Sequence, residues 1–270
     1  MNRDFILRHW YASVYDQFEE NPRDIPFLLR VLKEQTDGTP QNILEAACGG
    51  GRMRVPLAEA GHLVTGFDAD PFMLLHCYRK AKHLPNLRMF EMNILDPDWG
   101  AGYDAVVVSG NVLINLEYLP GTVTYRQAQR VLIQSAAKAL RPGGHLYLDF
   151  DLHADPFAVF HGSKPKAAHY FEGTDDLGTT GRTCGYGGIY DPVTRQLVGS
   201  NHAELTTNGG EFLVFENTWG KHIPTQAQVY GWLKDADLVL EQAYRNYTDE
   251  PLSEPIPEKT WHATLWARKT

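Results

Sequence analysis

The amino-acid sequence predicts an α/β fold: a doubly wound, seven-stranded, mostly parallel sheet with an antiparallel β insertion after the fifth strand. Two observations support this prediction. After Pro40, short apolar runs alternate with helical stretches, a pattern typical of parallel strands joined by crossover helices. Between about Thr179 and Trp219, short alternating stretches rich in Gly, Thr and Tyr replace the helices and favour antiparallel strands.

Two helices are expected before the sheet begins. Apolar residues at helical spacing between Leu7 and Phe18 predict the first helix, which ends before Pro22. Asp24 is a candidate N-cap of the second helix, which ends before Gly38.

The other elements follow in order along the chain. Strands are expected at residues 43–46, 63–67, 87–91, 103–108, 145–149, 238–247 and 261–267. Crossover helices are expected to end at Ala60 and Leu140 and to begin at Pro71 and Thr225. Within the insertion, residues 190–194 and 208–210 have the composition of hairpin turns.

The composition favours a small-molecule partner. The 270 residues include 25 basic and 33 acidic side chains, a net charge of -8, and no run forms the basic patch that a nucleic-acid backbone requires. The cysteines, three in number and widely spaced, fit neither a disulfide framework nor a zinc site and indicate a reducing, cytoplasmic setting. We expect no signal peptide and no membrane span, and the composition leaves a homodimer open.

A glycine-rich turn follows the first strand. Residues 42–52, Asn-Ile-Leu-Glu-Ala-Ala-Cys-Gly-Gly-Gly-Arg, run from an apolar strand into a helix start, where backbone N–H groups can meet a ligand. Arg54 stands where a dinucleotide fingerprint needs glycine, and the Gly-Lys-Ser/Thr of a phosphate-binding loop is absent, so nicotinamide and ATP sites are disfavoured. Asp68 ends the second strand, where a carboxylate can accept both ribose hydroxyls, so a nucleoside is expected.

At these residues the sequence resembles the class I S-adenosylmethionine-dependent methyltransferases of the small-molecule type. The glycine motif of that family, Glu/Asp-x-Gly-Cys-Gly-x-Gly, is matched by residues 45–51, with Ala47 in place of the first glycine. Asp68, the Asn93-Ile94 pair and the Leu-Arg-Pro-Gly-Gly of residues 140–144 are further matches. The resemblance covers residues 42–150.

The resemblance implies S-adenosylmethionine as the cofactor. The residues that it implies for cofactor binding are Tyr11, Tyr15, Glu45, Ala47, Gly49, Gly51, Asp68, Ala69, Met73, Asn93, Ile94 and Ser109. Asn93 stands where the family usually has an aspartate over the adenine, and its amide oxygen can still accept a hydrogen bond from the adenine amino group. The alternative for Asn93 is a turn residue that follows a strand.

The resemblance also implies three parts of the chain. Residues 1–40 are an amino-terminal helical lid, residues 41–153 with 223–270 are the Rossmann-like core, and residues 154–222 are an antiparallel β cap over the acceptor. The lid has an alternative, because an aromatic stripe at helical spacing is also what ordinary helix packing produces.

The acceptor is expected at the carboxyl ends of the fourth and fifth strands. Asp151 and His153 are the predicted catalytic residues, and His153 is taken as the only imidazole at these strand ends, with a solvated loop histidine as the alternative. No metal is predicted, because His153 and Asp155 have no third ligand nearby. The predicted acceptor-binding residues are Asn111, Asn115, Tyr186, Trp219 and His222.

The predicted function is methyl transfer from S-adenosylmethionine to an O or N atom of a small molecule. The alternative is a non-catalytic module that binds the nucleoside and uses the insertion as an interaction surface. An RNA methyltransferase is disfavoured, because Ser-Gly-Asn-Val at residues 109–112 stands where such an enzyme carries an Asn/Asp-Pro-Pro-Tyr/Phe motif.

Overall fold

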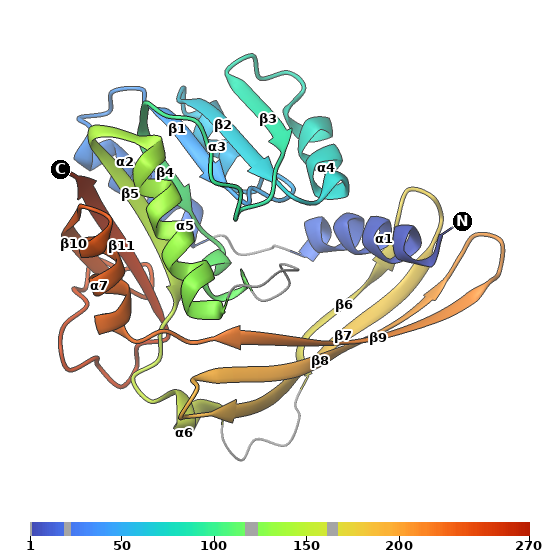
Figure 1. Ribbon diagram of the computed structural model, residues 1–270. Helices are drawn as coiled ribbons and strands as arrows, with labels where there is room; N and C mark the ends of the chain where they lie inside the picture. Colours follow the sequence, from blue (N-terminus) through green and yellow to red (C-terminus); the bar gives the residue numbers. More distant parts are fainter. Residues whose placement is uncertain (1, 19–22, 117–123, 161–166) are drawn as a thin grey trace.

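The computed structural model describes residues 2–18, 23–116, 124–160 and 167–270. Seven strands form its central sheet, in the order β10-β11-β5-β4-β1-β2-β3 (Figure 1). They are β1 (Asn42–Ala46), β2 (Leu63–Asp68), β3 (Leu87–Glu91), β4 (Tyr103–Val108), β5 (Leu140–Asp151), β10 (Leu238–Arg245) and β11 (His262–Lys269). β1 to β5 pair in parallel, and β11 runs antiparallel to both β5 and β10. The predicted doubly wound, mostly parallel sheet is confirmed.

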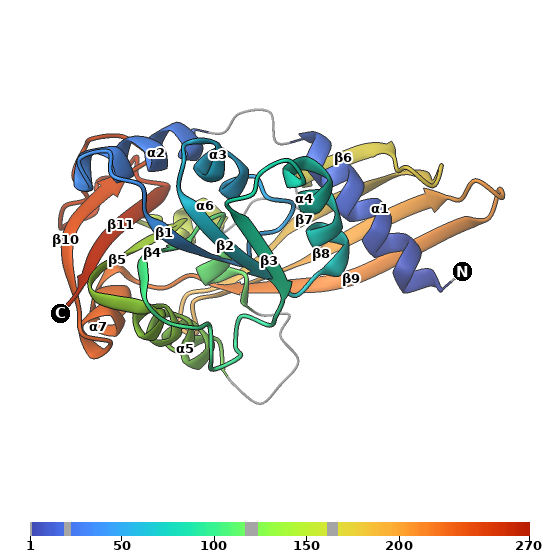
Figure 2. The same cartoon turned by 90° about the horizontal axis from the view of Figure 1, so that it is seen from above.

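Helices cover both faces of this sheet (Figures 1 and 2). α5 (Tyr125–Ala139) and α7 (Gln226–Asp235) belong to the apolar core on the face of Leu44 and Val106. α2 (Asp24–Gln35) and α3 (Arg54–Glu59) pack on the opposite face, with Ile43 and Val107. Because successive strand residues point to opposite faces, strands covered on both sides read as continuous apolar runs.

Capping side chains determine where the crossover helices begin. Asp70 accepts a hydrogen bond from the Phe72 N–H over 2.8 Å, which starts α4 (Pro71–Ala81) at the predicted place. Thr124 and Thr225 form capping boxes at the starts of α5 and α7.

β5 begins earlier than the sequence pattern predicts, at Leu140 instead of residue 145. Gly144 permits this, since a Cβ atom there would lie 3.0 Å from the backbone oxygens of Tyr103, Asp104 and Arg141. The Pro-Gly-Gly segment therefore ends α5 and also forms part of the strand.

The insertion is a second, antiparallel sheet in the order β6-β7-β8-β9. Its strands are β6 (Ala167–Thr174), β7 (Thr180–Asp191), β8 (Gln196–Thr206) and β9 (Phe212–His222), and α6 (Pro156–Phe160) precedes them. The hairpin turns expected near residues 190–194 and 208–210 are confirmed. The sequence pattern does not predict α6 or β6, because β6 depends on pairing with β7 and on contact with α1.

α1 (Arg3–Phe18) lies between α4 and one face of the four-stranded sheet (Figures 1 and 2). Trp10 and Val14 of α1 share an apolar cluster with Leu205 and Leu213 of the sheet. The helix expected in this part of the chain is confirmed, and its buried stripe is the contact with the insertion.

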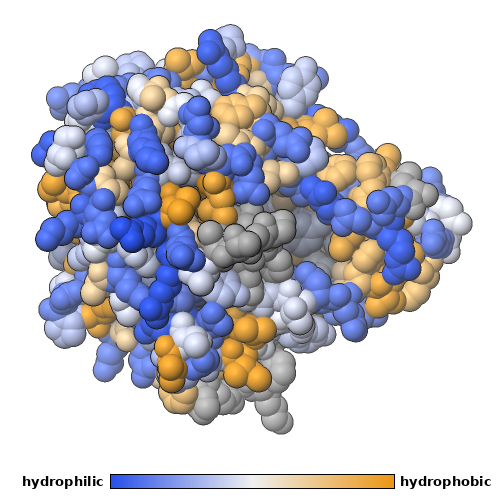
Figure 3. All heavy atoms as spheres, in the orientation of Figure 1, coloured by the Kyte–Doolittle hydropathy of each residue, from blue (hydrophilic) through white to orange (hydrophobic). Residues whose placement is uncertain are grey.

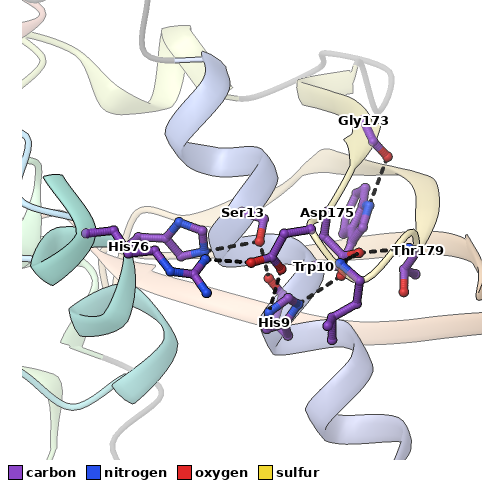
Figure 4. A network of polar contacts seen from close by, with 10 residues as sticks. His9, Trp10, Ser13, His76, Gly173, Asp175 and Thr179 are labelled. Atoms are coloured by element: carbon purple, nitrogen blue, oxygen red, sulfur yellow. Dashed lines mark hydrogen bonds and ion pairs between the residues drawn. The ribbon is translucent and has the colours of Figure 1, made fainter.

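Polar contacts also hold α1 in place (Figure 4). The Nδ1 atom of His9 lies 2.9 Å from Oδ2 of Asp175, in the turn between β6 and β7. Ser13 Oγ lies 3.1 Å from Nε2 of His76 on α4, so α1 joins the core to the insertion.

The described residues include no helix that is long and apolar enough to cross a membrane. Hydrophilic side chains cover most of the face shown in Figure 3, and hydrophobic ones form small separate groups there.

Candidate active site

A mostly apolar cavity of about 200 Å³ lies at the carboxyl ends of β1 and β2. Asp68 is the one charged residue among the described residues of its lining. The lining residues are Ala47, Phe67, Asp68, Ala69, Met92, Ile94, Val112, Asn115 and Leu116. This volume is below the 300–1,000 Å³ range that is typical of drug-sized ligands, so the cavity fits one ring system of a larger ligand.

The glycine turn adopts the backbone conformation that the sequence motif suggests. Ala47, Gly49 and Gly51 have φ values of 53°, 50° and 87°. A Cβ atom on Gly51 would lie 2.4 Å from Sγ of Cys77, whereas one on Gly49 would meet nothing within 4 Å. Glycine is therefore required at Gly51 by packing and conformation together.

Ala47 is the residue that departs from the family motif, and its positive φ is unfavourable for a side chain. We expect Ala47→Gly to raise the free energy of unfolding by about 0.5–1 kcal/mol, since relief of the left-handed conformation exceeds the added entropy of the unfolded chain. Denaturant unfolding of both proteins measures this difference. A loss of stability in the variant would show that the Ala47 methyl group contributes more through packing than its conformation costs.

The Asp68 carboxylate is held by the turn. Its Oδ2 accepts a hydrogen bond from the Gly49 N–H over 2.8 Å, and its Oδ1 accepts one from the Asp70 N–H over 2.8 Å. Burial raises the pKa of Asp68, and these two hydrogen bonds oppose the shift. Each oxygen keeps a further lone pair for a ligand.

Glu45 and Arg54 lie beneath the turn, in the protein interior. The Nε atom of Arg54 lies 2.8 Å from Sγ of Cys77. Burial raises the pKa of Glu45 to about 8, although the positive charge of Arg54 opposes the shift. Glu45, which was predicted to bind the cofactor, is thus placed to support the turn, and it lines neither cavity of the site.

A second cavity has a volume of about 280 Å³. It is aromatic and charged, and its lining residues are Tyr15, Arg23, Asp24, Arg52, Gly110, Asn111, Tyr247 and Trp261. The NH1 atom of Arg52 lies 2.5 Å from Oδ2 of Asp24. Gly110 and Asn111 line this cavity and Val112 lines the other, so the loop after β4 connects them.

Next to the second cavity, a polar cluster joins β5 to β11. His262 Nδ1 lies 3.3 Å from Oδ1 of Asp151, and His262 Nε2 lies 3.8 Å from Oδ1 of Asp149. The Tyr247 hydroxyl donates to Oδ2 of Asp149 over 3.3 Å, and the Tyr247 ring stacks on His262 with centroids 4.2 Å apart.

Asn111 connects this cluster to the loop after β4. Its φ of 64° lies in the left-handed region, where asparagine is more tolerant than most residues. Its Oδ1 accepts a hydrogen bond from the Asp151 N–H over 2.6 Å, and its own N–H points to Oδ1 of Asp149 at 3.5 Å.

The two carboxyl groups of the cluster differ in acidity. Burial raises the pKa of Asp149 to about 6, although His262 opposes the shift. Burial would also raise the pKa of Asp151, but the hydrogen bond and charge of His262 outweigh it and lower that pKa. The cluster therefore holds a weaker and a stronger acid on either side of one imidazole.

Asp149 makes stability depend on pH. Because folding raises its pKa from 3.8 to about 6, the folded state binds this proton more tightly than the unfolded chain. The stabilisation is present below about pH 4 and is lost as the pH rises through about 6. We expect Asp149→Asn to remove this loss. From pH 4 to pH 7, the free energy of unfolding of the parent should therefore fall by about 1–3 kcal/mol relative to that of the variant. Equal pH slopes in urea titrations of both proteins would contradict this.

His153 is half-buried and packs edge-on against Phe160, with ring centroids 5.2 Å apart. Burial lowers its pKa, although the charge of Asp151 opposes the shift. The expectation that His153 is the only imidazole at these strand ends is wrong, because β11 pairs His262 directly with Asp151.

Other residues predicted for the cofactor lie in several places. Tyr15 lines the second cavity together with Asn111, which was predicted for the acceptor, and Asn115, also predicted for the acceptor, lines the first cavity. Asn93 Oδ1 accepts the Leu95 N–H over 2.9 Å, the geometry of a turn residue. Tyr11, Met73 and Ser109 line neither cavity.

Two of the predicted acceptor residues line neither cavity of the site. Tyr186 pairs with Ser200 and lines a different cavity, of about 830 Å³, on the four-stranded sheet. His222 is 1% exposed and its Nδ1 lies 2.8 Å from Oε1 of Gln129 on α5, so burial lowers its pKa to about 4. Neither side chain lines the two cavities of the site, and the role of either residue toward an acceptor stays a prediction.

Trp219, also predicted for the acceptor, is largely buried. A Cβ atom on Gly199 would lie 2.2 Å from its ring, so the indole packs closely against the backbone of β8. This contact makes Trp219 part of the packing of the insertion.

Sequence reasoning missed His262, Tyr247 and Asp149. A signal for Asp149 is present, since Asp149 and Asp151 are two apart in one strand and therefore share a face. No local pattern marks His262 or Tyr247. Among the described residues, no group of His, Cys, Asp or Glu side chains has the arrangement of a metal site.

Comparisons with known proteins agree with this geometry. A family model described as a methyltransferase domain matches residues 43–144. The ubiquinone biosynthesis O-methyltransferase of Idiomarina loihiensis is 28% identical over 127 residues, which cover 45% of this chain and 47% of that protein. The chain thus spans about half the length of the curated relatives that it matches.

Solved structures share the whole fold. An S-adenosylmethionine-dependent methyltransferase from Clostridium acetobutylicum has a TM-score of 0.68 at 14% identity and covers 99% of both chains. The sugar N-methyltransferase KedS8 from Streptoalloteichus has a TM-score of 0.69 at 16% identity, covering 96% of this chain and 93% of its own. Residues 43–144 therefore match a methyltransferase domain, and the chain shares its fold with these solved structures.

Proposed function

We propose that this protein transfers a methyl group from S-adenosylmethionine to an O or N atom of a small molecule. The observation that carries the proposal is the pair of cavities to which the loop after β4 contributes lining residues. One is apolar with the Asp68 carboxylate at its edge, the other is aromatic and charged, and the loop of Gly110 and Asn111 lies between them. Such a pair suits S-adenosylmethionine, with the adenosine part in one cavity, the methionine part in the other, and the reactive methyl group near the loop between them.

The first cavity is the proposed adenosine site. Ala69 and Ile94 would flank the base, and Asp68 would accept hydrogen bonds from the ribose hydroxyls, since its two oxygens are aimed by backbone N–H groups. The Arg52–Asp24 ion pair offers a cation and an anion to the carboxylate and ammonium of the methionine end.

The acceptor would occupy the remainder of the second cavity, between Tyr247, Trp261 and Asn111. The whole cavity has a volume of about 280 Å³ and would also hold the methionine end, so only a small acceptor, or the reacting part of a larger one, would fit beside it. KedS8, a sugar N-methyltransferase, shares the fold, which supports an amine among the candidate acceptors. Alignment of the attacking atom with the methyl group can contribute about 7–11 kcal/mol, so positioning supplies most of the catalysis.

In this proposal α1 is the lid and residues 154–222 are the cap. α1 contacts α4, which starts beside the proposed ribose site, through Ser13 and His76. It contacts the insertion through His9 and Asp175, as Figure 4 shows. Burial lowers the pKa of Lys221 on β9, and the charge of Asp151 opposes the shift; this interaction between β9 and β5 supports the proposed role of the insertion as a cap.

Calorimetric titration with S-adenosylmethionine and S-adenosylhomocysteine tests the proposal. We expect both to bind, and NAD and ATP to bind far more weakly. Binding of NAD or ATP without binding of either methionine derivative at millimolar concentration would refute it. Cofactor binding without turnover of any amine or hydroxyl acceptor would favour a non-catalytic module instead.

A further inference from the structure

His262 lies between two carboxylates that belong to one strand. Its Nδ1 faces Asp151 at 3.3 Å and its Nε2 faces Asp149 at 3.8 Å. The register of β11 and β5 produces this arrangement, since His262 pairs directly with Asp151, and Thr264 pairs with Asp149. Both nitrogen atoms of the ring thus have a carboxylate oxygen as their nearest charged neighbour among the described contacts.

The three side chains differ in their exposure to solvent. The side chain of Asp149 is 0% exposed and that of His262 is 2% exposed, whereas that of Asp151 is 32% exposed. Tyr247 covers the imidazole face, and Asn111 fixes the backbone of Asp151. Asp151 is therefore the one member of the cluster with a partly exposed side chain, and it is bonded to Asn111, which lines the second cavity.

Packing alone does not account for this cluster. Burying a carboxylate at Asp149 costs free energy, and an apolar residue of similar size would avoid that cost. His262 Nε2 is buried and has no hydrogen-bond partner within the described chain. An imidazole with one unused nitrogen aimed at a buried carboxylate is suited to proton movement more than to stability.

We propose that Asp151, His262 and Asp149 form a proton relay that accepts the proton released by an amine acceptor. This inference rests on the proposed methyl transfer, and it selects amines among the acceptor classes. Asp151 is the catalytic residue, because it can touch the acceptor. His262 and Asp149 act through it and are positioning residues.

The steps balance in protons and electrons. An N–H bond of the acceptor's ammonium breaks, an O–H bond forms on Asp151, and the nitrogen keeps the electron pair. That O–H bond breaks as His262 Nδ1 takes the proton, while the proton on Nε2 passes to Asp149 Oδ1. The freed electron pair forms a bond to the methyl carbon, and the breaking C–S bond leaves its electrons on sulfur.

The surrounding charges favour this direction of transfer. The groups that face the relay are Asp24, Arg52, Tyr147, His153, Lys221 and Tyr247. His262 and the charge of Lys221 lower the pKa of Asp151 despite its burial, so Asp151 does not retain a proton. Burial raises the pKa of Asp149 to about 6, so Asp149 is the better proton store.

The first experiment needs no acceptor. The Asp149 carboxyl is followed by carbon-13 NMR between pH 4 and 9, with Asp149→Asn to assign its signal. We expect a midpoint near 6 that moves upward by about half a unit or more in His262→Gln, because the imidazole favours the ionised carboxyl. His145→Gln is the matched control. His145 lies in β5, as Asp149 does, and like His262 it stacks on an aromatic ring, that of Trp266, and contacts a carboxylate, that of Glu241. An unchanged midpoint in His262→Gln would overturn the relay.

The second experiment measures turnover of primary amines, with glycine and an aminopentose as probes, at saturating S-adenosylmethionine. We expect His262→Gln and Asp149→Asn to lower kcat by about 10- to 100-fold near neutral pH with unchanged cofactor affinity. The loss should shrink as the pH approaches the pKa of the amine, because a deprotonated amine needs no relay. A loss that is constant with pH would assign these residues a structural role and overturn the relay.

The two proposals can fail separately. If the parent protein does not bind S-adenosylmethionine, the proposed function is wrong. If it binds but neither probe amine reacts, the NMR titration alone decides whether His262 and Asp149 are coupled.

Discussion

Asp68→Ala is expected to weaken the binding of S-adenosylmethionine by about tenfold to a thousandfold, or about 1.5–4 kcal/mol. The variant removes the charged acceptors that would hold the ribose hydroxyls. It also releases the N–H groups of Gly49 and Asp70, each 2.8 Å from a carboxylate oxygen, so the glycine turn loses its anchor. Calorimetric titration of both proteins measures the change.

Asp68→Asn is the matched variant for this experiment. It keeps an acceptor for one of the two backbone N–H groups and removes the charge, so its affinity should lie between those of the parent and the alanine variant. Denaturant unfolding shows whether each variant is folded. An unchanged dissociation constant in folded Asp68→Ala would mean that the carboxylate only caps the strand and that the ribose lies elsewhere.

Gly51→Ala is expected to lower the free energy of unfolding by about 2–4 kcal/mol and to weaken cofactor binding. Its φ of 87° costs an alanine about 1–2 kcal/mol. Its Cβ would also lie 2.4 Å from Sγ of Cys77, and such overpacking adds about 1–3 kcal/mol. The Cys77 side chain is fully buried, so relief requires movement of the turn or of α4.

Gly61→Ala separates the two contributions. Gly61 has a φ of 94°, and a Cβ atom there would meet nothing within 4 Å, so only the conformational cost applies. The double variant Gly51→Ala/Cys77→Ala should recover part of the loss, because it removes the sulfur atom that the new methyl group meets. Equal stability losses in Gly51→Ala and Gly61→Ala would show that the contact with Cys77 has no energetic effect.

The cofactor side of the site could largely be predicted from the sequence. Asp68 lies at the cavity edge, and Ala47, Ala69 and Ile94 line the same cavity, as their positions after β1, β2 and β3 indicate. Parallel strands bring their carboxyl ends to one edge of a sheet, so the order of elements along the chain already groups these residues. Other residues predicted for the cofactor line neither cavity, namely Tyr11, Glu45, Met73, Ser109 and Asn93, whose side chain caps a local turn.

The acceptor side could not be predicted in the same way. Asp151 and Asn111 are at the site, but His262 is 111 residues from its partner Asp151, and the sequence between them contains the whole insertion. A shift of one residue in the register of β11 would turn His262 to the other face of the sheet. His222 is an example of the opposite kind. The sequence predicted that it binds the acceptor, but in the structure its side chain is buried against α5.

By itself, the sequence determined the mostly parallel sheet, the cap at Asp70, and the glycine turn with its carboxylate partner Asp68. These features depend on backbone conformation and on hydrogen bonds between residues close in the chain, or on the direction that parallel strands share. Only the tertiary structure decided the sharing of one loop by the two cavities, the place of α1 and the cluster around His262. Those depend on the pairing of an antiparallel strand and on side chains from β5, β11 and the loop after β10, which meet only when distant segments pack in one register.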